Sequence, residues 1–187
     1  LEYDLAKEIN GQAVATEIAR HELYGCTGAE MVQEMKPYHI DFPNVKNNCL
    51  RFEVSPSIEE SATFTDADWA ELGNDFMQRM GLANHQYIII RHSGTESKKE
   101  QAHLHILANR VSLSGELYRD NWIGKKATEA ANAIAKERNF VQSQDIGKVN
   151  KAEIKEAMDG VLKKMQGFDF TKFKEELGKR GFKVREA

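Results

Sequence analysis

Cysteine is scarce in this chain of 187 residues, which contains only two, Cys26 and Cys49. Their spacing fits neither a disulfide framework nor a cysteine zinc site, so both are expected to be free thiols in a reducing cytoplasm. Apolar runs are also short: none approaches the roughly 18 residues that cross a bilayer, and no signal-peptide pattern is present. Because the sequence starts at Leu1 rather than at a methionine, the absence of a targeting signal excludes little.

Excess positive charge is lacking as well. The net charge of −3 gives no overall electrostatic indication of nucleic-acid binding. The charge is nevertheless uneven: residues 145–187 carry 11 basic and 8 acidic side chains, whereas residues 1–144 carry 15 and 21. This basic segment suits phosphate contacts, although a lysine-rich helix face is also typical of plain solvated surface. The length fits one domain, or one domain with an appendage.

Histidine is the residue type whose placement is most informative. Three of the six histidines, His92, His103 and His105, fall within fourteen residues. His103 and His105 are two apart, so in a strand both point to one face. The polar connector between the β-prone runs at about 86–92 and 102–111 favours an antiparallel hairpin that brings His92 opposite them. Three neutral imidazoles around one divalent cation leave positions open for substrate, although an isolated His-x-His pair usually binds nothing.

The surrounding pattern predicts an α+β fold, with a central antiparallel β-sheet, flanking helices and a C-terminal helical extension. Residues 49–55 alternate as a half-buried strand whose polar face carries Arg51, Glu53 and Ser55. Thr65 is placed to cap a helix whose apolar stripe runs from Trp69 to Met80. Further helices are expected at about 123–138, 150–165 and 170–181. We expect a core at residues 1–121 that contains the histidine hairpin, and a helical extension at residues 122–187 that packs on the core or contacts DNA.

The run His92-x10-His103-x-His105-x3-Asn109-Arg-Val resembles the metal motif of the relaxases, the mobilization nucleases of conjugative plasmids and transposons. Three further segments are similar to the family: Phe52-Glu-Val-Ser-Pro56, the approach from Met80 to Tyr87, and the helical region from Ile154 to Gly181. The family belongs to the endonuclease superfamily named for its histidine–hydrophobic–histidine core, which also contains rolling-circle replication initiators. The long helical extension favours a relaxase.

The resemblance implies a metal-dependent nickase of the bacterial cytoplasm that cleaves single-stranded DNA at a transfer origin. A tyrosine attacks the scissile phosphate and stays linked to the 5′ end. Tyr3, in a segment similar to the family's Tyr-x-Leu-x-Lys, is the predicted nucleophile, and Tyr24 and Tyr38 are the alternatives. Glu53 is expected to accept the spare N–H of a metal-bound imidazole, as an acidic residue on a comparable strand does in the family.

The predicted cofactor is one divalent metal ion held by His92, His103 and His105, with cellular availability favouring Mg or Mn and imidazole affinity favouring Zn, Ni or Co. Arg91, Asn109 and Arg110 are DNA-binding candidates that are equally typical of ordinary surface groups. Accessory mobilization and coupling proteins are expected as partners, and no membrane is; the sequence leaves the oligomeric state open. Three other functions stay open: a rolling-circle initiator, a DNA-binding module without a working nucleophile, and a three-histidine hydrolase of small substrates.

Overall fold

The computed structural model describes residues 2–6, 8–9, 12–94 and 101–185; for residues 2, 3, 9, 12, 13, 143, 144 and 146 it describes the backbone only. The chain divides into two compact units, residues 1–140 and 141–187, and each is described by itself. The first holds the sheet and most of the helices, so the predicted α+β class is confirmed. No helix in the described ranges combines the length and apolar character needed to cross a membrane.

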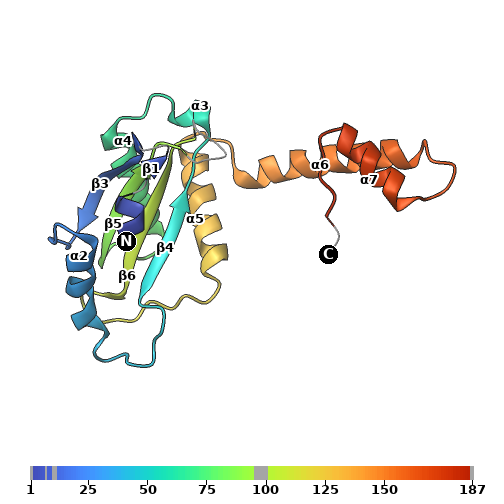
Figure 1. Ribbon diagram of the computed structural model, residues 1–187. Coiled ribbons are helices and arrows are strands. Elements are labelled where there is room, and N and C mark those ends of the chain that lie inside the picture. Colours follow the sequence, from blue (N-terminus) through green and yellow to red (C-terminus); the bar gives the residue numbers. More distant parts are fainter. Residues whose placement is uncertain (1, 7, 10–11, 95–100, 186–187) are drawn as a thin grey trace. The chain divides into compact units, whose positions relative to one another are not determined.

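A four-stranded antiparallel sheet in the order β3-β5-β6-β4 forms the centre of the first unit (Figure 1). Its strands are β3 (Ala15–His21), β4 (Cys49–Val54), β5 (His85–His92) and β6 (His103–Ser112). Strands β5 and β6 pair as the predicted hairpin. A separate pair of two-residue strands, β1 (Glu8–Ile9) and β2 (Gln12–Ala13), precedes β3.

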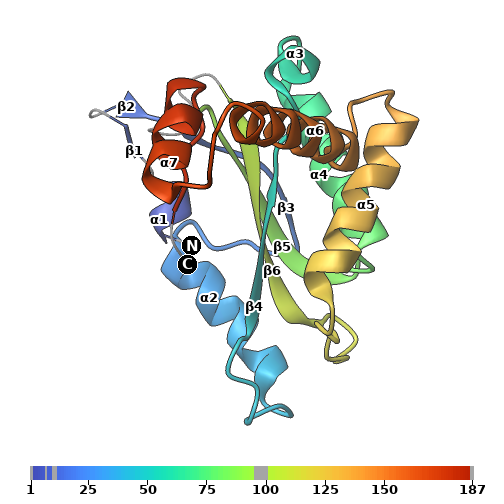
Figure 2. The ribbon, with the colours of Figure 1, turned by 90° about the vertical axis from the view of Figure 1, so that its right-hand side faces the viewer.

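The two faces of the sheet are covered by different helices, as the view along the sheet edge shows (Figure 2). Helices α4 (Asp66–Arg79) and α5 (Ile123–Glu137) cover one face, where Ile89, Ile106 and Ala108 belong to the larger apolar core. Helices α1 (Glu2–Leu5) and α2 (Gly28–Met35) cover the other face, where Ile88 and Ile90 are buried. Burial on both faces explains why the central strand β5 is apolar without alternation.

Helix α4 forms where the sequence predicts it, because its start and its packing are both encoded locally. Thr65 and Asp68 make a reciprocal capping box at its first turn. The predicted stripe from Trp69 to Met80 is buried against the sheet. Gly73 lets the helix approach β5 closely, since a Cβ there would lie 2.7 Å from Ile89 Cδ1. Two short helices complete this part of the chain: the 3₁₀ turn η1 (Lys36–His39) and α3 (Ile58–Ser61).

Helix α5 belongs to the first compact unit, and the second unit begins at Val141. The physical reason is the apolar side of α5: Ala130 and Ile134 are buried in the same core as α4. The second unit contains α6 (Ser143–Leu162) and α7 (Phe170–Lys179), which share a small core around Val161, Phe173 and Leu177.

Candidate metal centre

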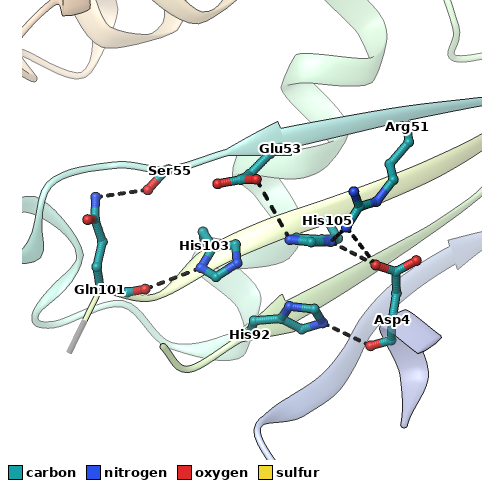
Figure 3. A network of polar contacts seen from close by, with 8 residues as sticks. All are labelled: Asp4, Arg51, Glu53, Ser55, His92, Gln101, His103 and His105. Atoms are coloured by element: carbon teal, nitrogen blue, oxygen red, sulfur yellow. Dashed lines mark hydrogen bonds and ion pairs between the residues drawn. The ribbon is translucent and has the colours of Figure 1, made fainter. Parts of the chain in front are cut away.

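The three predicted histidines converge at one end of the β5–β6 hairpin (Figure 3). His92 at the end of β5 is directly opposite His103 at the start of β6, and His105 follows two residues later on the same face. One ring nitrogen of each can be chosen so that all three lie within 4.8 Å of one another. All three side chains are buried. The expectation that the hairpin gathers these rings is therefore confirmed.

Hydrogen bonds to the protein fix which nitrogen each ring presents. His92 donates from Nε2 to the backbone carbonyl of Asp4 over 2.8 Å. His103 donates from Nδ1 to the carbonyl of Gln101 over 3.2 Å. His105 donates from Nδ1 to Asp4 Oδ1 over 2.9 Å. Each bond selects one tautomer, so the metal-binding nitrogens would be Nδ1 of His92 and Nε2 of His103 and His105.

Arg51 and Asp4 form an ion pair beside His105. Arg51 Nη2 lies 2.9 Å from Asp4 Oδ1 and 2.6 Å from His105 Nδ1. A guanidinium only donates, so its hydrogen bond goes to the carboxylate, which also accepts the imidazole N–H. Burial raises the pKa of Asp4, but the hydrogen bonds from His105 and Arg51 outweigh it and hold that pKa below its ordinary value. Asp4 is therefore an anion at neutral pH.

This donor set fits a divalent transition metal. Burial lowers the pKa of His105, despite the opposing hydrogen bond to Asp4, so the ring is neutral at pH 7 as a ligand must be. Three imidazoles are fewer ligands than such ions take, so positions remain for water or substrate oxygens. The oriented N–H groups supply the outer hydrogen bonds that metal-bound histidines ordinarily make.

The acidic residue that bonds a histidine N–H is Asp4, which sequence reasoning did not single out. Glu53 pairs with His105 across β4 and β6, but its Oε2 lies 4.0 Å from Nε2, the nitrogen on the metal side. The Glu53 side chain is 62% exposed, whereas that of Asp4 is 5% exposed. A contact between positions 4 and 105 carries no signal in local periodicity; the one hint in the sequence is that Asp4 adjoins Tyr3.

The candidate tyrosines lie in different parts of the unit. Tyr3 is in α1, immediately before Asp4, and its side chain is outside what the structure describes. Tyr24 follows β3, whose last residue His21 pairs with Tyr87, five residues along β5 from His92. At about 3.3 Å per residue, that end of the sheet is roughly 16 Å from the histidines. The Tyr24 hydroxyl donates to Glu22, which raises its pKa and disfavours the phenolate.

Tyr38 precedes His39 in η1, and His39 donates from Nε2 to Asn109, four residues along β6 from His105. Four residues of strand span roughly 13 Å, so η1 also lies toward the far end of the sheet. Of the three candidate tyrosines, Tyr3 is therefore the one whose neighbour in the chain touches the metal centre.

The three DNA-binding candidates are not gathered at the histidines. Arg91 and Arg110 point to the α4–α5 face, where Arg91 pairs with Asp66 and Arg110 with Asp120. Asn109 shares the face of His105, as its parity predicts, but it is completely buried. Its side chain bonds within the protein, to Gln86 among others.

The fold and the site define an α+β protein with a three-histidine candidate metal site on an antiparallel hairpin. The family model "Relaxase: MobA/VirD2-like, nuclease domain" matches residues 3–140, nearly three quarters of the chain. The chain therefore belongs to this relaxase family, whose members are DNA-nicking endonucleases. No curated protein and no solved structure matches it. The match ends at Phe140, where the first compact unit also ends.

Proposed function

We propose that the protein nicks single-stranded DNA at the transfer origin of a plasmid or transposon, with Tyr3 as the nucleophile. The observation that carries this proposal is the contact of Asp4, the neighbour of Tyr3, with both His92 and His105. It ties the N-terminal helix to the metal centre, as a tyrosine nucleophile acting there requires. The alternatives Tyr24 and Tyr38 belong to segments toward the other end of the sheet.

The reaction is a transesterification. The Tyr3 oxygen forms a bond to the scissile phosphorus while the bond from phosphorus to the 3′ oxygen breaks. The phenolic proton is lost and a proton is gained by the 3′ oxygen, so the products are a 5′-phosphotyrosyl ester and a 3′-hydroxyl. The ester conserves the bond energy, and the strand can be rejoined by the reverse step.

His92, His103 and His105 would hold a divalent ion, Mg or Mn by availability, with Zn, Ni and Co as the alternatives. Such an ion supplies charge stabilisation and orientation for the phosphate. The chain's own contribution is to orient the three imidazoles through hydrogen bonds to Asp4 and Gln101. Glu53, whose Oε2 lies 4.0 Å from His105 Nε2, is proposed to accept a proton near the phosphate.

The second unit is proposed to add sequence-independent contacts to the DNA backbone. Residues 145–187 carry a net charge of +3, and side chains such as Lys148, Lys172 and Lys179 are well exposed. Lysines that bind DNA phosphates displace counterions from the DNA, so the part of the DNA affinity that this unit contributes should fall steeply as the salt concentration rises.

The proposal is tested by incubating the protein with Mn²⁺ and single-stranded oligonucleotides that span a transfer origin, and separating the products on a denaturing gel. A protein–DNA adduct is expected, and Tyr3→Phe should abolish it while Tyr24→Phe and Tyr38→Phe leave it intact. Cleavage without an adduct would indicate a hydrolase, and binding without cleavage would indicate a DNA-binding module. His103→Ala should abolish nicking but keep most of the DNA affinity; normal nicking by that variant would refute the metal centre.

A further inference from the structure

Helix α1 contacts the metal centre through Asp4 at two separate atoms. The side-chain carboxylate accepts the N–H of His105, and the backbone carbonyl accepts the N–H of His92. Arg51 on β4 holds the same carboxylate from the other side. Asp4 is 4% exposed, so these bonds form away from solvent, where an unmade one is costly. One residue thus bonds two of the three candidate ligands, and it is the immediate neighbour of Tyr3 in the chain.

We propose that Asp4 is a positioning residue that couples occupation of the metal centre to docking of helix α1, the segment that carries Tyr3. Binding of the ion strengthens the hold on α1, and docking of α1 strengthens the binding of the ion. Only the functional meaning of the coupling rests on the proposed nucleophile; the coupling itself concerns Asp4, His92 and His105.

The first half of the coupling runs from Asp4 to the metal. A carboxylate that accepts the Nδ1–H of His105 fixes the tautomer that presents Nε2 and raises the basicity of that nitrogen. The negative charge of Asp4 also offsets part of the charge of a cation held by three neutral rings. The backbone carbonyl does the same for the tautomer of His92, whatever side chain stands at position 4.

The second half runs from the metal to Asp4. An imidazole that binds a cation through one nitrogen becomes a stronger hydrogen-bond donor at the other, because the cation withdraws electron density from the ring. Both bonds to Asp4 therefore strengthen when the site fills. Thermodynamic linkage requires the two effects to be equal: docking of α1 raises metal affinity by the factor by which metal favours docking.

Metal affinity tests the first half. Co²⁺ binding to the full chain is measured by titration calorimetry for wild type, Asp4→Asn, Asp4→Glu and the control Asp75→Asn, which alters a partly exposed carboxylate on α4 that pairs with Arg79. Asp4→Asn should weaken Co²⁺ binding by about 10- to 100-fold, the usual cost of losing such a partner. Asp4→Glu should recover part of the loss, and the control should match wild type. Wild-type affinity in Asp4→Asn would overturn the proposal.

Hydrogen exchange tests the second half, first in the wild-type protein and then in Asp4→Asn. With saturating Co²⁺, the wild-type peptide that covers Glu2–Leu5 should exchange several-fold more slowly than without it, while a peptide from α7 serves as internal reference. In Asp4→Asn the slowing should be smaller, because one of the two bonds is weakened. Equal exchange of the α1 peptide with and without Co²⁺, in a protein shown to bind the ion, would overturn the coupling.

These outcomes separate the coupling from the proposed function. If wild type binds no Co²⁺, both the coupling and the metal centre are refuted. If Co²⁺ binds and both coupling signals appear, but Tyr3→Phe still forms the DNA adduct, the coupling stands and the nucleophile assignment fails. If the adduct depends on Tyr3 but Asp4→Asn changes neither affinity nor exchange, the function stands and Asp4 is a structural residue only.

Discussion

Asn109→Ala decides whether Asn109, on the histidine face of the sheet, serves in DNA binding or in the stability of the fold. The sequence makes Asn109 a DNA-binding candidate, whereas the structure buries it and uses its amide inside the protein. Its Oδ1 accepts from His39 Nε2 and from the amide of Val111, and its Nδ2 donates to Gln86 Oε1 and to the carbonyl of Met35.

The expected effect of Asn109→Ala is a loss of stability. Four hydrogen bonds at a net value of about 0.5–1.5 kcal/mol each set the scale, and partial relaxation brings the expected loss to about 3 kcal/mol. For a unit of 140 residues this corresponds to a Tm lower by roughly 10 °C. DNA affinity of the folded variant at low temperature should stay within about twofold of wild type, because phosphate contacts dominate affinity.

The assay combines thermal unfolding followed by circular dichroism with oligonucleotide binding followed by fluorescence anisotropy. Asn84→Ala, which removes one exposed hydrogen bond to Ser114, is the matched control and should change stability by less than about 0.5 kcal/mol. A variant of Asn109 with wild-type Tm and much weaker DNA binding would refute the reasoning and restore the DNA-binding role.

Three further outcomes are expected. Gly73→Ala should destabilise the first unit by about 1 kcal/mol in denaturant titrations, because crowding against Ile89 outweighs the higher helix propensity of alanine. Gly124→Ala, which has open space around it, should not destabilise the unit. A more stable Gly73 variant would contradict the close packing of α4 on β5. Burial lowers the pKa of His85, so its contribution to stability is complete above the unfolded-state pKa near 6.5 and is lost as the pH falls below that value. His85→Gln should therefore flatten the plot of unfolding free energy against pH between pH 7 and 5. An unchanged slope would exclude His85 as a cause of the pH dependence. Leu177→Ala should cost about 2–4 kcal/mol in the small core of the second unit and speed hydrogen exchange in α6 and α7; unchanged exchange would show that this core does not hold the two helices together.

The features that the sequence predicts well are those encoded by neighbouring residues. The His-x-His spacing sets a shared face within one strand, and the polar connector implies the hairpin that adds His92. The Thr65 capping box and the stripe that follows it define α4 almost to the residue. In each case the physical cause lies within about fifteen residues of chain, which is the range over which periodicity and capping act.

The features that local patterns miss depend on contacts between distant residues. Asp4 meets His105 only because α1 lies over the sheet, a contact that the local periodicity around either residue does not predict. Helix α5 reads as part of a helical tail because its own pattern is amphipathic, yet its buried side completes the core beside α4. An amphipathic pattern indicates that a helix packs against something, but it does not indicate which element the helix packs against.

Strand parity in the sequence indicates where the arginines near the histidines point. Arg91 precedes His92 in β5, and adjacent residues of a strand point to opposite faces, so a metal-facing histidine directs its neighbour away from the metal. Arg110 stands in the same relation to Asn109. Arg51, two residues before Glu53 on the strand beside His105, has the parity that points toward the centre, and the structure places its guanidinium against Asp4 and His105. In the proposed reaction, a phosphate bound at the histidines would approach Arg51, whose charge is already shared with Asp4, so the proposed cation would carry most of the charge balance there.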